Sequence, residues 1–252
     1  MLPPLQTAAR SGDVEELRAL LLRGVSPHSR DIIGATALHW VCPGPRKAGQ
    51  IDCLKLLVEH GASVDARDTL GNTPLHFCVM LDSGTLPADN AAIMSWLIEA
   101  GADVRARTNR GREPLHLAVR FGAVECTVTL LKAGASVNAR SNVGGYPYPG
   151  MTPLEFAVAD KSNHTNTAPC LHRVWPILLR AGANLYAETD EINQVLDEVP
   201  YIRKVRHAGS IRNYEHEHLN AISATFIPKF SRLLPPELVR RVVELAFHAG
   251  YY

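Results

Sequence analysis

The sequence predicts an all-α solenoid in which stacked helix pairs are joined by finger-like turns. Two recurring phrases predict it. The first reads G-A-S-V-D-A-R in its clearest form and closes each helix pair, with copies at residues 61–67, 101–107, 134–140 and, more loosely, 182–188. The second reads T-P-L-H and opens the next pair, with copies at residues 36–39, 73–76, 113–116 and 152–155. Such units have no cavity of their own and stack into an extended concave surface, so we expect the chain to bind another macromolecule.

The outer helix of each pair is predicted by apolar residues at fixed distances before the repeat glycine. Gly24, Gly61, Gly101, Gly134 and Gly182 each follow such a segment and can adopt the left-handed conformation that ends a helix. The apolar positions share one helical face and are filled by Leu20/Leu21, Leu57/Val58, Leu97/Ile98, Leu130/Leu131 and Leu178/Leu179.

The inner helix begins at the T-P-L-H phrase, where threonine caps the helix and proline takes its first position. Together the two phrases resemble the ankyrin repeat, whose signature combines T-P-L-H-x-A with a later L-L-x-x-G-A-x-x-N. The resemblance covers residues 5–187 and implies five helix pairs with finger turns, the first of them (residues 5–31) a capping repeat. It also implies a non-catalytic scaffold or adaptor whose protein partner lies on the concave and finger face.

Three histidines and one asparagine acquire roles from this resemblance. His39, His76 and His116 occupy one position of the repeat, where the family's histidine bonds the threonine of its own motif and the backbone of a neighbouring turn. We therefore interpret them as structural residues and not as a ladder of metal ligands. Asn138 lies at the finger position that asparaginyl hydroxylases modify in some ankyrin proteins, with Leu130 upstream as that family prefers.

A column of arginines is expected along the fingers, because one follows six residues after each of four repeat glycines. Its members are Arg30, Arg67, Arg107 and Arg140. The fork of a guanidinium suits carboxylates, so we predict that the column, with Tyr146 and Tyr148 of an enlarged turn, binds a protein with an acidic segment. The alternative is a row of solvated side chains with no partner.

The period is interrupted by insertions at residues 43–50, 81–90, 144–150 and 160–171. We predict a repeat domain over residues 1–188 and a helical C-terminal cap or adaptor module over 189–252. Helices are expected at 218–230 and 235–247. The apolar face of the second consists of Leu238, Val242, Leu245 and Ala246, and we expect it to pack on the first and on the fifth repeat.

The C-terminal helices have a second interpretation. The L-P-P-E-L run at residues 234–238 resembles the start of an F-box, and residues 219–235 are similar to a SOCS box. Either resemblance implies a substrate receptor of a cullin-type ubiquitin ligase that binds a ligase subunit through residues 219–247.

Composition and the remaining motifs exclude several classes of function. The net charge is +1, which provides no general field for nucleic acid or membrane. We expect no cofactor, since no phosphate-binding or dinucleotide-binding phrase occurs. A metal-dependent enzyme is a distant alternative that needs His207, His216 and His218, whose spacing suits a metal poorly. Five cysteines without a C-x-x-C pair suit the cytoplasm or nucleus.

Overall fold

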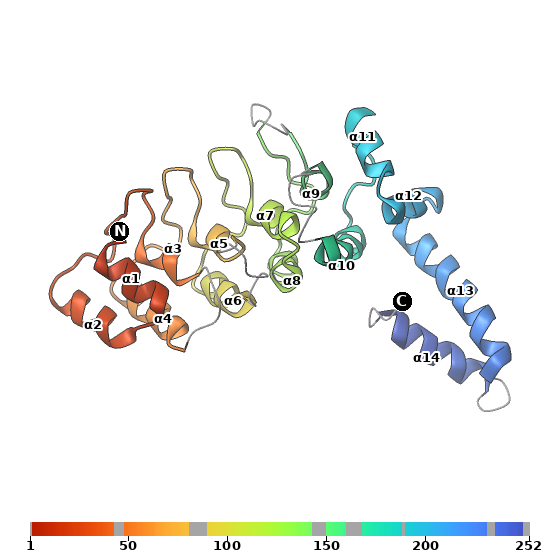
Figure 1. Ribbon diagram of the computed structural model, residues 1–252, viewed down its shortest axis with the longest axis horizontal. Helices are drawn as coiled ribbons and strands as arrows, with labels where there is room; N and C mark the ends of the chain where they lie inside the picture. The colour runs from red at the N-terminus through yellow and green to blue at the C-terminus, as the bar shows by residue number, and fades with distance from the viewer. Residues whose placement is uncertain are drawn as a thin grey trace. The chain divides into compact units, whose positions relative to one another are not determined.

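The computed structural model divides the chain into two compact units, Met1–Ile192 and Asn193–Tyr252. It describes residues 2–42, 48–80, 90–142, 150–159, 168–187, 190–230 and 235–248 (Figure 1). Most of each predicted insertion lies outside these described residues. Each unit is treated by itself below.

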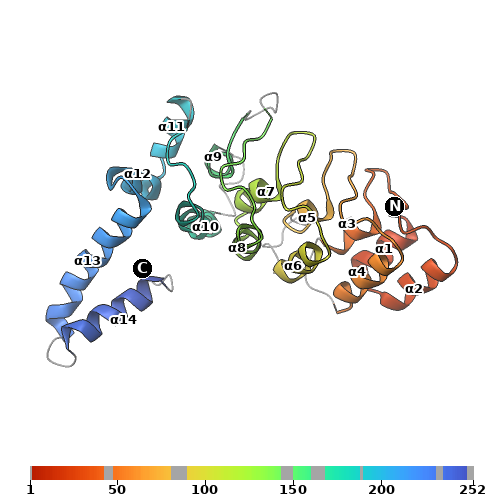
Figure 2. The same cartoon turned by 180° about the vertical axis from the view of Figure 1, so that it is seen from behind.

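The first unit is the predicted solenoid of helix pairs. The inner helices are α1 (Pro4–Ser11), α3 (Ala37–Val41), α5 (Pro74–Phe77), α7 (Pro114–Arg120) and α9 (Pro153–Ala159). The outer helices are α2 (Val14–Leu22), α4 (Gln50–Glu59), α6 (Ala91–Glu99), α8 (Val124–Lys132) and α10 (Ala168–Arg180). Figures 1 and 2 show the fingers rising on the same side of the inner helices from either viewpoint. The predicted fold class is thus confirmed.

Leucines at two repeated positions form the core of this unit. The inner helices contribute Leu5, Leu38, Leu75, Leu115 and Leu154, all with 0% of their surface exposed. The outer helices contribute the residue four before each repeat glycine, namely Leu20, Leu57, Leu97, Leu130 and Leu178, none more than 7% exposed. Burying a leucine stabilises a protein by about 1.5 to 3 kcal/mol. Because a single pair covers only part of these side chains, the repeats stabilise one another by stacking.

Successive fingers are joined by backbone hydrogen bonds near their tips. Thr69 N–H donates to the Ile33 carbonyl at 3.0 Å, Asn109 N–H to that of Leu70 at 2.9 Å, and Asn142 N–H to that of Arg110 at 3.0 Å. The returning limb of one finger therefore lies beside the outgoing limb of the next. This close approach explains the glycine at the end of each turn. A Cβ on Gly71 would lie 2.7 Å from the backbone nitrogen of Asn109.

The second unit contains helices that the sequence did not predict. Residues 189–212 are polar with weak periodicity, yet they include α11 (Asp190–Asp197) and α12 (Pro200–His207). Helix α11 begins just before the unit boundary, and most of it belongs to the second unit. Three apolar residues of the two helices, Leu196, Ile202 and Val205, are each 0% exposed. Arg206 joins the two helices by donating to Asp197 at 2.7 Å and to the side chain of Asn193 at 2.8 Å.

The two predicted C-terminal helices are present with altered limits. They are α13 (Ile211–Phe230), which starts seven residues earlier than expected, and α14 (Pro236–His248). A membrane-spanning helix, which needs length and apolar character together, is not found in the described part of the chain.

The contact between fingers makes a testable prediction about two glycines. Gly61 and Gly71 have φ of 87° and 78°, so an alanine at either position costs about 1 to 2 kcal/mol of backbone strain. A Cβ at Gly61 meets nothing within 4 Å, whereas one at Gly71 meets the next finger. Urea unfolding should therefore show that Gly71→Ala destabilises the protein by about 1 to 3 kcal/mol more than Gly61→Ala. Equal losses would contradict this account of the fingers.

Candidate functional site

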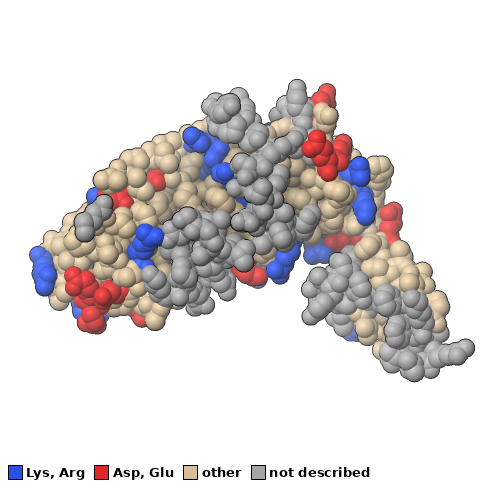
Figure 3. Space-filling view, viewed as in Figure 1, with Lys and Arg blue, Asp and Glu red and all other residues tan. Residues whose placement is uncertain are grey.

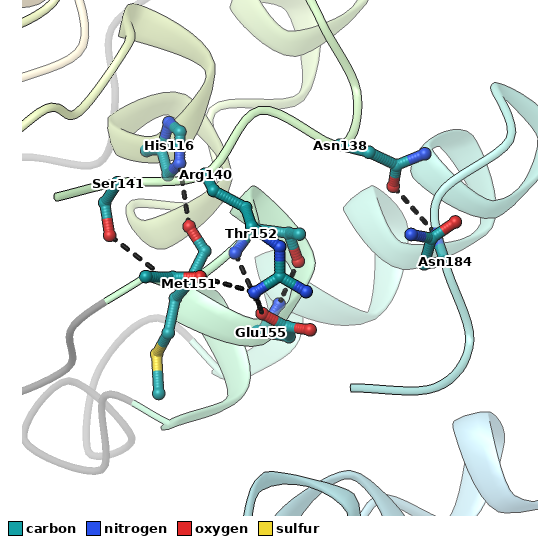
Figure 4. Close-up of polar contacts among 9 residues, drawn as sticks. His116, Asn138, Arg140, Ser141, Met151, Thr152, Glu155 and Asn184 are labelled. Carbon is teal, nitrogen blue, oxygen red and sulfur yellow. Dashed lines mark hydrogen bonds and ion pairs between the residues drawn. The ribbon is translucent and has the colours of Figure 1, made fainter. Parts of the chain in front are cut away.

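Three buried histidines link the inner helices α3, α5 and α7 to the fingers that follow them. The Nδ1 atoms of His39, His76 and His116 accept backbone N–H bonds from the start of their own helices, at 3.0 to 3.1 Å. Each Nε2 donates to a carbonyl of the next finger at 3.1 Å. These carbonyls belong to Asn72, Arg112 and Met151, the last of which is drawn in Figure 4. All three rings are fully buried.

These hydrogen bonds require a neutral ring. Protonating Nδ1 would replace the acceptor by a second donor that faces a backbone N–H. Burial lowers the pKa of His76 to about 4 and that of His116 to about 4, although hydrogen bonds to carbonyls act in the opposite direction. Burial also lowers the pKa of His39. The rings are therefore uncharged near neutral pH.

The position of these histidines in the repeat is filled by glutamine in the first inner helix and by glutamate in the last. Gln6 Nε2 donates to the Ser29 carbonyl of the first finger at 2.9 Å, and the cap of its helix is Pro3, which has no N–H to satisfy. Glu155, in contrast, accepts a hydrogen bond at the start of its own helix and donates none. Its Oε2 accepts the N–H of Thr152 at 2.9 Å and lies 4.0 Å from Arg140 Nη1 (Figure 4). Each end residue thus performs one of the two tasks of the histidine.

Three of the four predicted finger arginines donate to backbone carbonyls of the fingers, and two of these three reach the next finger. The guanidinium of Arg30 donates to the carbonyls of Gly34 and Arg67, the first in its own finger and the second in the next. Arg107 repeats this arrangement with Gly111 at 3.2 Å and Arg140 at 2.6 Å. Arg140 donates to the Gly150 carbonyl at 2.6 Å. This role was not predicted, because it depends on where the next finger places its backbone. The binding role predicted for the column stays a prediction.

Arg67 is the exception in this column. Its side chain is exposed and makes no hydrogen bond or ion pair with the described residues. Arg110, at the tip of the third finger, is also exposed, and its side chain makes no hydrogen bond or ion pair with the residues that the structure describes. The sequence could have indicated Arg110, since the same turn position is apolar in the two preceding fingers.

A second series of contacts crosses the base of the fingers, four residues after the repeat glycines 61, 101 and 134. Asp65 accepts the N–H of Asp103 at 3.0 Å, and Arg105 donates to the Gly134 carbonyl at 2.8 Å. Asn138 does both, donating to the Gly182 carbonyl at 2.9 Å and accepting the Asn184 N–H at 2.8 Å (Figure 4). An amide is suited to this position because it carries a donor and an acceptor together. Hydroxylation of Asn138 stays a prediction.

The fingertips differ along the array. Ile32 is 92% exposed, Leu70 63% and Ile33 40%, whereas the corresponding turn of the third finger consists of Asn109 and Arg110. In Figure 3 the first two fingertips are mostly tan, and basic side chains gather near the finger that leads into α7. The finger face is therefore apolar at its N-terminal end and basic further along.

Aromatic rings and arginines meet on the inner helices behind the fingers. The Arg10 guanidinium lies 5.4 Å from the centre of the Trp40 ring, and Trp40 Nε1 donates to Asp31 at 2.7 Å. Further along, the Arg112 guanidinium lies 4.4 Å from the ring of Phe156. Such contacts fix the inner surface, because a cation over an aromatic face is attracted by the ring.

The remaining predicted site residues are not brought together. Tyr146 and Tyr148 lie outside the described residues. His207 Nδ1 donates to the Arg203 carbonyl at 2.8 Å, and the His218 ring stacks on Tyr214 with ring centres 5.7 Å apart. His216 is exposed. Among the side chains that the structure describes, no three metal-ligating residues form a group that could hold an ion.

The orientation predicted for the last helix is wrong for two residues. Leu238 and Val242 were expected to be buried, but they are 49% and 57% exposed, while Val239 is 4% exposed. Helix α14 contacts α13, with Arg240 donating to Asn220 at 3.3 Å. The helix is therefore rotated from the predicted orientation and directs Val239 inward. The side chains of Leu245 and Ala246 lie outside the described residues.

Comparison with protein families gives the chain its class. The model for ankyrin repeats in three copies matches residues 5–106 and 85–172. The chain therefore belongs to the ankyrin-repeat family, whose repeats are generally protein–protein interaction modules and typically not enzymes. A comparison with curated proteins found no match.

The buried histidines predict a loss of stability in acid. The unfolded chain takes up protons below the usual histidine pKa of 6.5, but His76 and His116 in the folded chain do so only near 4. Stability is therefore fully present above pH 6.5 and falls as the pH drops toward 4, by about 1.4 kcal/mol per pH unit for each histidine. Urea unfolding should show a loss on the order of 3 kcal/mol between pH 7 and pH 5.

A glutamine variant separates this effect from general acid sensitivity. His76→Gln keeps a donor toward the next finger, as Gln6 does, but cannot titrate. We expect it to lose about 1 to 3 kcal/mol at pH 7 and to show a weaker pH dependence. His28→Gln, at an exposed finger position, is the control. An unchanged pH dependence in the His76 variant would refute the assignment.

Proposed function

We propose that this chain is a non-catalytic adaptor whose protein partner contacts the fingertips and inner helices of the first unit. The observation that carries the proposal is the set of exposed apolar residues on the fingertips. Ile32, Ile33 and Leu70 are three of the five large apolar side chains that stand exposed in the described part of this unit. Adjacent exposed apolar residues on a rigid surface are typical of interaction sites.

The chemistry of the partner follows from the charges on this face. Arg67 and Arg110 are exposed and make no ion pair within the described residues, so an acidic segment of a partner could supply their counter-charges. We assign this role to Arg67 and Arg110 and treat Arg30, Arg107 and Arg140 as residues that maintain the surface.

We place the protein in the cytoplasm or nucleus. Cys42, Cys53 and Cys78 are buried thiols that form no disulfide within the described residues, which suits a compartment that keeps cysteine reduced.

Charge reversal at the fingertips tests the proposal. Tagged wild-type protein and the variant R67E/R110E are used to capture partners from cell lysate, and the captured proteins are quantified by mass spectrometry. The variant should lose the specific partners by about tenfold or more, because the reversed charges repel an acidic segment. Both residues are exposed and make no ion pair within the described residues, so we expect the melting temperature to stay unchanged.

The matched control is K55E/K132E, which makes the same change in net charge. Lys55 and Lys132 are exposed on the outer helices α4 and α8. This control should retain the partners. The proposal fails if R67E/R110E retains them all, or if both variants lose the same proteins.

A second candidate function is that of a ubiquitin-ligase substrate receptor. It is favoured by the exposure of Leu238 and Val242, which lie four residues apart on one face of α14. Residues at this spacing form a continuous apolar strip that a ligase subunit could cover.

Direct binding to purified elongin and Skp-type subunits tests this alternative. If it holds, the wild-type chain binds one of them, L238D/V242D abolishes the binding, and R241S, at an exposed polar position of the same helix, does not. Absence of binding by the wild-type chain would eliminate the ligase function while leaving the fingertip proposal unaffected.

A further inference from the structure

The fingertips form a row whose spacing is set by the backbone. Ile33, Leu70 and Arg110 occupy the same turn position in successive fingers, and the carbonyl of each accepts an N–H from the finger that follows. Each finger contributes two limbs, and hydrogen-bonded limbs lie about 4.8 Å apart. The three side chains therefore recur at intervals of about 9.6 Å.

This interval matches one conformation of an extended peptide. A polyproline II helix has three residues per turn and a rise of about 3.1 Å per residue, so every third side chain returns to the same face after about 9.3 Å. A β-strand repeats its face about every 6.7 Å, which does not match the interval. An α-helix needs seven residues to advance about 10.5 Å, and it overshoots two finger intervals by about 2 Å.

The side chains of the row change from aliphatic in the first two fingers to basic in the third. Ile33, with Ile32 beside it, and Leu70 present aliphatic side chains at a turn position where polar residues and glycine are usual. These aliphatic side chains take no part in the hydrogen bonds between tips, which use backbone atoms and the polar side chains of Thr69, Asn109 and Asn142. Arg110 follows them in the row, and Arg67 lies three residues before Leu70 in the second finger.

The nearby carboxylates are engaged inside the fingers. Asp68 accepts from the N–H groups of Leu70 and Asn72 and from the Asn72 side chain, at 2.7 to 2.8 Å. Asp31 accepts from the N–H groups of Ile33 and Ala35 and from Trp40, also within 2.9 Å. Neither forms an ion pair with Arg67 or Arg110. The two guanidiniums are therefore available to a carboxylate from outside.

We propose that the fingertip row binds a peptide segment of a partner in the polyproline II conformation. Apolar side chains at positions i and i+3 of the peptide lie on Ile33 and Leu70, and an acidic side chain at i+6 pairs with Arg110. The inference rests on the proposed function and adds the conformation, spacing and residue classes of the partner.

Synthetic peptides test the spacing directly. The probe is a fluorescein-labelled peptide with the core Leu-Pro-Pro-Leu-Pro-Pro-Glu, measured by fluorescence polarisation against the full chain. The matched peptide Leu-Pro-Leu-Pro-Glu-Pro-Pro has the same composition with spacing of two residues. We expect the probe to bind at least tenfold more tightly than the matched peptide.

Protein variants locate the site. Leu70→Asp and Arg110→Glu should each weaken binding of the probe at least tenfold, and a probe ending in lysine should regain affinity for Arg110→Glu. K55E/K132E should bind like wild type. Melting curves establish that each variant is folded. If Leu70→Asp does not fold, the pair of Arg110→Glu and the lysine probe still tests the site.

Three results would overturn the inference. The first is equal binding of the two proline peptides, and the second is normal binding of the probe by Arg110→Glu. The third is tighter binding of a helical peptide with leucines seven residues apart. If partner capture from lysate still depends on Arg67 and Arg110, any of these results leaves the proposed function standing and removes only the polyproline II peptide.

Discussion

The solenoid depends on a hydrogen bond that runs from a buried histidine ring to the finger beyond it. Leucine packing holds neighbouring helix pairs together, but it does not determine where the fingers lie. The histidine does, because its Nδ1 is fixed by the start of its own helix and its Nε2 then donates to the backbone of the next finger. Burial keeps the ring neutral, so both hydrogen bonds persist together.

The surface offered to a partner follows from this constraint. Once each finger is positioned, the bonds between tips and the bonds from Arg30 and Arg107 join the fingers side by side. The resulting row is formed before any partner arrives, so binding does not have to order it. The side chains that remain exposed on such a row can vary without disturbing the fold, which separates the residues that build the surface from those that distinguish partners.

Local pattern predicted the repeats well. The glycines, the capping threonines and the apolar spacing each depend on a few consecutive residues, and the helix pairs they predict are present. The arginine contacts were not predicted, because they require the position of a backbone some 33 to 37 residues away. Helix α12 was missed because two apolar residues, Ile202 and Val205, carry its buried face.

The candidate site was predicted in part. Arg67 was included in the expected column, but nothing in the phrase distinguishes it from Arg107, whose guanidinium is engaged by the next finger. The exposed row of Ile33, Leu70 and Arg110 could have been found by aligning the turn residues of the repeats. The orientation of α14 could not, since the helix carries two apolar strips and its sequence does not distinguish which of them faces α13.

The residues at the two ends of the histidine series specify how long the array is. Gln6 donates a hydrogen bond forward, while the Pro3 cap offers no N–H for its amide oxygen to accept. Glu155, as a carboxylate, can only accept, and it accepts the N–H of Thr152 at the start of its own helix. A repeat duplicated or removed between them finds a matching neighbour on both sides. A repeat joined after Glu155 would find an acceptor where it needs a donor. Repeats can therefore be gained or lost between Gln6 and Glu155, whereas Glu155 disfavours the addition of a repeat after it.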